Sequence, residues 1–540
     1  MAANLRWTAL TGALILLALT GGCSTSPPEA KARQTPATVS VTAQAHVPVF
    51  AIAAGAPVQY SHDEIEQFIT AAKAAESIPD RMQQCLDYPD PPRSHWPRDS
   101  VIAYCHYRLQ PIMSASSINT LIRHGRATEL ESRLQAALQA QQHGGNSPGL
   151  LDQIYEQDFS DTSAAERALL DSWKQSAPKS AFAYAASGYA YTQQAVAVRG
   201  GEYDQNVPRS HMQSMRRLLA LAEDDLQRAV ALDPKLTSAY VAWIRGANLN
   251  STHSYVQSIA ERALAAAPDD YGIYNELMFA YEPEWGGSLE AMRTLAARAQ
   301  MHAAENPLLG ILLTTPMSVR IDHCGCDASA QVAAYQRLFD DLPITAYMWK
   351  EGDLAATTKP AISVVYLSET LRFLPANPLV THAWAQRSLR LTDLGHPHWA
   401  LAEAKKVVAR DGQFSDGFNA MALASEALGD YAGAEAALKS AIALDRTQPW
   451  PLIELANIYA IKTHQWDKAW AVDNQAVALF PDNPGSLFLR GLIQMDQPRS
   501  GLADTVSLFA TRFGNDPAQQ ARLATLRSGL ERLPAKGGAH

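Results

Sequence analysis

The sequence predicts an all-α protein, a solenoid of stacked helical hairpins in two repeat blocks behind an N-terminal helical unit. Apolar residues recur at helical spacing along most of the chain. Small residues and prolines return after 34 residues, as expected for repeated hairpins. With 540 residues, 47% of them hydrophobic, the chain is too long for one compact core and should form several packed units or a solenoid.

The N-terminus predicts an exported protein. Residues 1–22 place Arg6 ahead of an apolar run and small residues, the pattern of a secretory signal peptide. The segment 19–23, LTGGC, resembles the processing box of bacterial lipoproteins, and this resemblance implies that Cys23 is lipidated. Ser24 then favours an outer-membrane anchor facing the periplasm. An ordinary signal peptide, giving a soluble periplasmic or secreted protein, is the alternative.

Charge and hydropathy narrow the range of direct partners. The formal net charge of −9 argues against nucleic acid and against anionic lipid headgroups. Beyond residue 23 no apolar stretch approaches the length of a membrane-spanning helix, so we expect the lipid alone to attach the protein to a membrane.

Composition and periodicity divide the chain into seven segments. They are a lipoprotein signal peptide (1–22), a flexible tether (23–60), an N-terminal helical unit (61–145), a repeat block with an insertion at 199–212 (150–310), an irregular cysteine-containing joint (311–360), a second repeat block (361–515), and a capping helix and tail (516–540).

The repeat period is clearest in the second block. Three pairs of residues stand one period apart: Trp384 and Phe418, Gly395 and Gly429, and Ala400 and Ala434. The next hairpin has one extra residue in its turn, near His464. In the first block Pro234 and Pro268 keep the same spacing.

These positions resemble the tetratricopeptide (TPR) superfamily over residues 150–307 and 360–515. The resemblance implies a superhelix whose first helices line a groove for a protein or peptide partner. The first block is also similar to a domain of unknown function in bacterial TPR proteins, through Arg199-Gly200-Gly201, the segment AVALDPKLTSAY and Trp285-Gly286-Gly287-Ser288. That domain has no established activity to carry over.

Six residues are candidates for partner contact. They are aromatic residues expected on first helices and residues of the two glycine-rich loops: Arg199, Tyr240, Trp243, Trp285, Trp384 and Phe418. Filling the hydrophobic core is the competing interpretation for each aromatic residue. If the two glycine-rich loops meet, Arg199, Trp285 and Glu284 would form a small recognition site, and two well-packed turns are the alternative.

Four cysteines remain if Cys23 carries lipid. In an oxidising compartment they suggest disulfides, and the economical pairing joins Cys85 to Cys105 and Cys324 to Cys326. A first alternative is a metal site for zinc or copper, with the ligands His323, Cys324, Cys326 and Asp327. A second alternative is that the Cys-Gly-Cys loop exchanges disulfides.

The leading functional hypothesis is an envelope lipoprotein that acts as a protein- or peptide-binding scaffold, without catalytic residues, cofactor or metal. The alternative is a metal-binding or thiol-redox module centred on the Cys-Gly-Cys loop. A third hypothesis is a hydrolase with an unrecognised site in the irregular segment 308–360.

Overall fold

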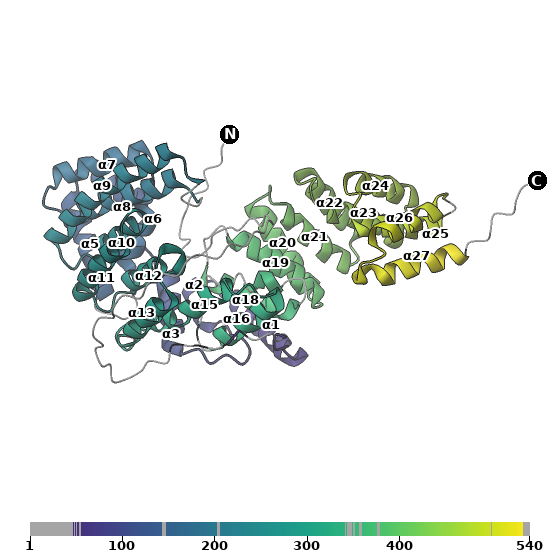
Figure 1. Cartoon of the computed structure of the whole chain (residues 1–540), viewed down its shortest axis with the longest axis horizontal. Coiled ribbons are helices and arrows are strands. Elements are labelled where there is room, and N and C mark those ends of the chain that lie inside the picture. Colours follow the sequence, from purple (N-terminus) through teal and green to yellow (C-terminus); the bar gives the residue numbers. More distant parts are fainter. Residues whose placement is uncertain are drawn as a thin grey trace, which may run out of the picture. The chain divides into compact units, whose positions relative to one another are not determined.

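The computed structural model describes residues 56–532 except 143–146, 202–205, 375–378, 498 and several positions between 341 and 358, together with residues 47, 49, 51 and 52. The expected signal peptide, Cys23 and most of the tether lie outside the described residues. Regular structure in the described part is entirely helical, which confirms the all-α class (Figure 1). The chain divides into two compact units, residues 1–354 with 372–375 and residues 355–371 with 376–540.

The first unit starts with short helices and continues into longer hairpins. Its helices are α1 (His62–Glu76), α2 (Arg81–Asp87), α3 (Arg98–Leu109), α4 (Ala115–Arg123), α5 (Ala127–Gln142), α6 (Leu150–Asp158), α7 (Ala164–Ser176), α8 (Ala181–Arg199), α9 (Arg209–Leu232), α10 (Thr237–Asn250), α11 (His253–Ala266), α12 (Tyr271–Ala280), η2 (Pro283–Trp285), α13 (Leu289–Gln300), α14 (Leu308–Ile311), η3 (Leu312–Thr314), α15 (Thr315–Asp322) and α16 (Ala328–Phe339).

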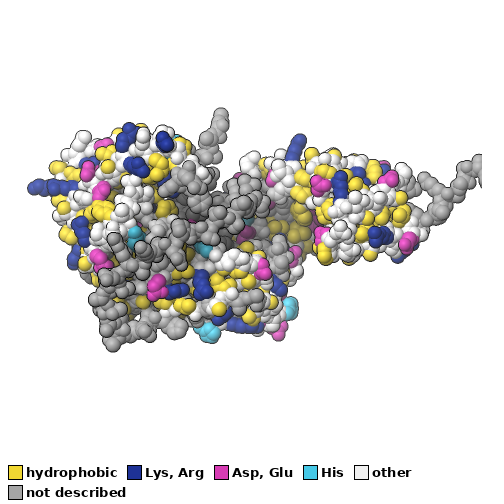
Figure 2. Space-filling model, viewed as in Figure 1, with side chains coloured by type: hydrophobic (Ala, Val, Ile, Leu, Met, Phe, Trp, Pro, Cys, Tyr) yellow, Lys and Arg dark blue, Asp and Glu magenta, His cyan; other side chains and the backbone are white. Residues whose placement is uncertain are grey.

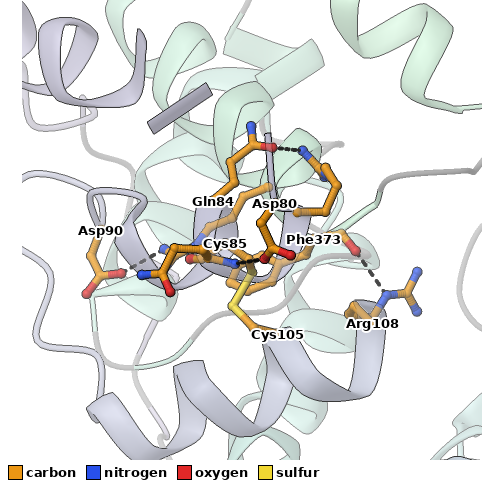
Figure 3. Close-up of a disulfide and its surroundings, with 10 residues drawn as sticks. Asp80, Gln84, Cys85, Asp90, Cys105, Arg108 and Phe373 are labelled. Atoms are coloured by element: carbon orange, nitrogen blue, oxygen red, sulfur yellow. Dashed lines mark hydrogen bonds and ion pairs between the residues drawn. A yellow bond between two sulfur atoms is a disulfide. The ribbon is translucent and has the colours of Figure 1, made fainter. Parts of the chain in front are cut away.

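A disulfide between Cys85 on α2 and Cys105 on α3 crosslinks the N-terminal helices. Figure 3 shows this bridge beside Asp90 and Phe373, the last residue of α18 (Pro360–Phe373). Arg372 donates hydrogen bonds to the Cys85 carbonyl at 2.9 Å and to the Asp90 carboxylate at 2.8 Å. The bridge therefore stabilises the part of the first unit that holds the end of α18.

The end of the expected tether is anchored. Val58 exchanges two hydrogen bonds with the Gln336 side chain on α16, at 2.9 and 2.8 Å, and Pro57 is buried. The tether was expected to extend to residue 60. Residues 56–60 instead belong to the folded unit, because a single glutamine amide pairs with both backbone groups of Val58.

The long hairpin α8–α9 shows why the first block needs small residues. A Cβ added to Gly188 on α8 would come within 2.5 Å of Leu226 on α9, so only glycine allows this approach. The insertion at 199–212 lengthens the hairpin, since α8 runs to Arg199 and α9 begins at Arg209. Pro234 and Pro268, one period apart, follow α9 and α11 at equivalent turns.

Segment 311–360 contains more helix than the sequence suggested. α15 and α16 occupy much of its described part. The irregular appearance of the sequence comes from the short loop His323–Asp327 between them, where Asp327 caps α16 by accepting a hydrogen bond from the Ala330 amide at 2.8 Å.

A buried polar cluster joins four helices of the first unit. Gln141 at the end of α5 donates hydrogen bonds to Asp152 at 2.8 Å, to Thr237 at 3.0 Å and to Asp270 at 2.6 Å. Thr237 also donates to Asp152 at 2.8 Å. Asp270, 6% exposed, caps α12 by accepting from the Ile273 amide. Burial raises the pKa of Asp270 to about 6, and burial with the neighbouring Asp270 raises the pKa of Asp152.

The second unit stacks regular hairpins. Its helices after α18 are α19 (Leu379–Asp393), α20 (Pro397–Arg410), α21 (Ser415–Ala427), α22 (Tyr431–Leu444), α23 (Trp450–Asn457), η4 (Ile458–Lys462), α24 (Trp466–Leu479), α25 (Pro484–Asp496), α26 (Leu502–Phe513), η5 (Pro517–Gln519) and α27 (Gln520–Arg532).

The periodic glycines form equivalent turns. Gly395 follows α19 with φ of 86°, and Gly429 follows α21 with φ of 77°. In both turns the next residue's amide reaches a carbonyl five residues back at 2.8 Å, from His396 to Leu391 and from Asp430 to Ser425. The glycines therefore recur because each turn requires a left-handed residue.

The third hairpin absorbs its extra residue in a π-helix. α23 continues into the π-helical turn η4, and His464 takes the left-handed position with φ of 53°. The Gln465 amide closes the turn on the Tyr459 carbonyl at 2.6 Å. The extra residue near His464 thus widens one helical turn and leaves the following helix able to pack with Ala469 fully buried.

A fully buried ion pair joins the helices of the first hairpin in the second unit. Arg387 on α19 pairs with Glu403 on α20, and neither side chain is exposed. Arg387 also donates to the Ser368 hydroxyl on α18 at 2.9 Å, and its guanidinium lies 5.0 Å from the Trp399 ring centre. The Glu403 carboxylate therefore lies against the Arg387 charge inside the protein.

We expect Glu403→Ala to reduce the free energy of unfolding by about 3–5 kcal/mol, because it removes the carboxylate that pairs with the fully buried Arg387 guanidinium. Urea unfolding of the full chain measures this loss. The matched control is Glu435→Ala, which removes the exposed pair with Lys439 (side chains 26% and 58% exposed) and should cost at most about 1 kcal/mol. Equal losses would contradict the buried-charge interpretation.

The Asp152–Asp270 cluster predicts a pH dependence of stability. A carboxyl whose pKa is raised by folding stabilises the native state below its unfolded pKa, and this stabilisation is lost as the pH rises through the folded pKa. The free energy of unfolding should therefore fall by about 2 kcal/mol or more between pH 4 and about 6. Asp152→Asn should flatten this decline in urea titrations at each pH. A wild-type protein that gains stability over this range would contradict the assignment.

Candidate functional site

Two loops that the sequence singles out separately meet at one cavity in the first unit. The cavity has a volume of about 540 Å³. The loop after α12 contributes Pro283 and Glu284, and the loop after α15 contributes His323, Cys324 and Cys326. Cavities of this size accommodate small molecules or individual peptide side chains. This cavity is the candidate functional site.

The shape of the first loop depends on its paired glycines. Gly286 follows the 3₁₀ turn Pro283–Trp285 with φ of 86°, and a Cβ added to Gly287 would overlap the Tyr281 carbonyl. Ser288 then caps α13 by accepting a hydrogen bond from the Ala291 amide at 3.1 Å. Glycine at 287 therefore folds the loop tightly back on the end of α12 and positions Glu284.

Arg199 and Trp285 lie together, as the hypothesis of a shared recognition site required. The Arg199 guanidinium is 5.7 Å from the Trp285 ring centre, and both side chains are half-buried. Trp285 also packs against Phe279, with 5.1 Å between ring centres. The two glycine-rich loops thus meet, and Glu284, next to Trp285, faces the cavity.

His323 links the two loops of the cavity. Its Nδ1 lies 2.8 Å from the Val319 carbonyl and its Nε2 lies 2.8 Å from the Glu284 carboxylate. The Val319 carbonyl and then Glu284 raise the pKa of His323, because both ring nitrogens face acceptors. Burial and the nearby Glu284 raise the pKa of Glu282 to about 7.

The second loop carries a disulfide between Cys324 and Cys326. Gly325 between them has φ of 62°, a conformation that glycine adopts without strain. Both cysteines line the cavity and are half-buried, whereas Cys85 and Cys105 are 1% and 0% exposed. The two disulfides therefore differ in accessibility.

The side chains of the possible metal site have other partners in this structure. His323 contacts Val319 and Glu284, Cys324 is bonded to Cys326, and Asp327 caps α16. Within the described residues no group of three or more His, Cys, Asp or Glu side chains has a metal-binding arrangement. A metal here would require the disulfide to be reduced.

The structure places the aromatic candidates in two different environments. Tyr240 and Trp243 are each 3% exposed, because α10 packs against α8, α9, α11 and α12. This burial removes both from the set of surface contacts and favours the core-filling interpretation. Trp384 and Phe418 in the second unit are half-buried and keep part of their rings at the surface.

Sequence patterns did not indicate several groups around the cavity. Ile52, Leu289, Val319 and Arg320 also line it, although no motif includes them. Leu289 on α13 comes together with Val319 and Arg320 on α15 through packing of the two helices, and Ile52 comes from the segment before α1. The apolar ones look like ordinary core residues in the sequence.

A G-x-S-x-G spacing occurs around Ser147, at residues 145–149. The described residues 147–149 lead directly into α6 within a helical unit. A nucleophile elbow requires a turn from a strand to a helix. Ser147 therefore does not have the setting of that motif.

The comparisons with known proteins give only distant similarities. The TPR domain of P58(IPK) aligns at 12% identity over 75% of this chain and 98% of that chain, with a TM-score of 0.23. The APC/C hetero-tetramer Cut9-Hcn1 aligns at 13% identity over 86% of this chain and 94% of that chain, with a TM-score of 0.32. No family model and no curated protein matches. The TPR-like solenoid expected from the sequence is confirmed by the chain's own stacked hairpins, and similarity at this level adds nothing about function.

Proposed function

We propose that this protein is a scaffold that binds a protein or peptide partner through the first helices of its second repeat block. The observation that carries the proposal is a row of partly exposed aromatic and acidic side chains on successive first helices. α19 packs beside α21, and Glu426 on α21 pairs with Lys462 in the turn η4 that continues α23, so the first helices form a common face. We call the exposed side of α19, α21 and α23 the first-helix face.

Half-buried aromatic residues occur on each helix of the first-helix face. Trp384 lies on α19, Phe418 on α21 and Trp450 on α23. Trp450 also packs against the core cluster around Leu455, so part of its surface is already used. Large, rigid rings that are held by the core and still partly exposed favour binding at low entropic cost.

An acidic pair adds charge to this face. Burial and the neighbouring Glu426 on α21 raise the pKa of Glu454 on α23 to about 7. Glu426 pairs with Lys462 at 3.2 Å, and Asn457 donates to Glu454 at 3.0 Å. Trp450 and Glu454 are four residues apart and so lie on one side of α23. This arrangement suits a polypeptide with a basic residue next to an apolar one.

The charge distribution also favours a polypeptide partner. On the face drawn in Figure 2, acidic and basic side chains alternate with hydrophobic ones over the described surface. An extended basic area of the kind that binds nucleic acid is not seen on the described residues in this view. Among the described residues, no helix is both long and apolar enough to cross a bilayer.

The proposal includes the location of the scaffold. The signal pattern of residues 1–22 and the LTGGC box support export and lipidation at Cys23, and Ser24 supports an outer-membrane anchor facing the periplasm. The partner would then be a component of the cell envelope. A soluble periplasmic or secreted form is the alternative if Cys23 is not acylated.

Site-specific crosslinking tests the binding face. We expect a photo-crosslinking amino acid at Phe418 to capture one partner reproducibly in intact cells, because this position lies on the first-helix face. The matched control is the same amino acid at Lys439 on the second helix α22, whose side chain is 58% exposed and should capture little of that partner.

Variants on α23 should reduce this capture. Trp450→Ala and Glu454→Gln should each weaken binding of the captured partner about tenfold, the loss expected of a contact worth about 1.4 kcal/mol. Equal crosslinking at Phe418 and Lys439, or binding unchanged in both α23 variants, would reject the first-helix face.

Acylation gives a separate prediction. The N-terminal peptide of the purified protein should carry acyl chains on Cys23, as measured by mass spectrometry, and the protein should fractionate with membranes. Cys23→Ser should move the protein to the soluble fraction. If Cys23 is unmodified and the protein does not fractionate with membranes, the anchored form is wrong and the soluble form is correct. The proposal of partner binding does not depend on this result.

A further inference from the structure

We propose that the cavity beside the Cys-Gly-Cys loop is a thiol–disulfide exchange site, at which the Cys324–Cys326 disulfide oxidises a low-molecular-weight thiol. The proposal concerns the first unit only, so it is independent of partner binding at the first-helix face. It depends on the position of the disulfide, on the groups around each sulfur and on the adjoining cavity.

Accessibility separates this disulfide from the other one. Cys324 and Cys326 line the cavity, whereas Cys85 and Cys105 are buried under the N-terminal helices. Exchange requires an incoming thiolate to reach a sulfur atom. A small thiol in the cavity can therefore meet the Cys324–Cys326 bond while the buried disulfide stays intact.

The surroundings of the two sulfur atoms differ, and this difference sets the direction of attack. The Cys324 sulfur accepts a hydrogen bond from the Cys326 amide at 3.3 Å and a weaker one from the Gln331 side-chain amide at 3.9 Å. The same donors stabilise a thiolate at Cys324 when the bond breaks. Cys324 is therefore the leaving group, and Cys326 is the sulfur that is attacked.

The exchange balances with two equivalents of thiol. The first thiolate attacks the Cys326 sulfur, and the electron pair of the broken bond leaves on the Cys324 sulfur. A second thiolate then attacks the substrate sulfur of the mixed disulfide and releases the Cys326 thiolate. Two thiols have become one disulfide, and the protein has gained two electrons and, after protonation of both cysteines, two protons.

The cavity favours a small thiol over a large one. Its volume of about 540 Å³ suits a molecule of modest size. Pro283, Leu289 and Val319 provide an apolar wall, and Arg320 and Glu284 add one positive and one negative charge. These groups suit a small thiol that carries both an ammonium group and a carboxylate.

The test uses the oxidised full-length protein with reduced glutathione as the probe. After timed alkylation, peptide mass spectrometry reports the reduction of each disulfide. We expect Cys324–Cys326 to be reduced about tenfold faster than the same disulfide in a synthetic peptide of residues 320–331, while Cys85–Cys105 stays oxidised. A rate equal to that of the peptide, or lower, would overturn the proposal.

Three variants test the mechanism, so the test does not depend on any one of them folding correctly. In Cys324→Ser, oxidised glutathione should form a stable mixed disulfide at Cys326. In Cys326→Ser, the remaining Cys324 thiol should be alkylated with a lower apparent pKa than the Cys326 thiol of the first variant, and the reverse order would overturn the assigned direction. Leu289→Trp should slow reduction by glutathione by narrowing the cavity, with circular dichroism unchanged.

A second probe, a thiol on a polypeptide, tests whether the substrate is a low-molecular-weight thiol or a protein thiol. An unfolded polypeptide with one cysteine should react more slowly than glutathione, because its chain does not fit the cavity. A faster reaction with the polypeptide would overturn the assignment to a low-molecular-weight thiol.

Discussion

The close approach of two helices within each hairpin is the constraint on which the solenoid depends. Where α8 meets α9, the side chain of Gly188 must be absent because Leu226 occupies its space. In the second unit the fully buried Ala422 and Ala434 serve the same purpose between α21 and α22. A larger residue at these positions would separate the helices and expose the apolar surface that the next hairpin must cover.

Buried charges add specificity to this apolar stacking. Arg387 and Glu403 connect α19 to α20 where no water reaches, and the Asp152–Asp270 cluster connects α6 to α12 in the first unit. Neither arrangement tolerates a shifted neighbour, because a displaced partner would leave a buried polar or charged group without its hydrogen bonds. Apolar contacts alone would permit several registers, and these polar contacts select one.

The sequence predicted the repeated elements well, because each repeat carries the same local requirements. The glycine spacing at Gly395 and Gly429 corresponds to two left-handed turns, and the extra residue near His464 corresponds to a π-helical turn. The candidate cavity was only partly predictable. Glu284 and His323 were both singled out in the sequence, but their contact depends on the packing of α13 against α15. Tyr240 and Trp243 are of residue types that often contact partners, but they are core residues here, since α10 packs against α8, α9, α11 and α12.

The π-helical turn at Ile458–Lys462 has an evolutionary consequence. A step of 34 residues from Gly429 reaches Thr463, one position before the left-handed His464, so this hairpin carries one residue more than the repeat period, inside a helix. Because each hairpin contacts only its neighbours, such a change is confined to one turn. Repeat arrays of this kind can therefore gain or lose single residues without losing the order of their helices, and their ancestry becomes hard to trace by comparing sequences position by position.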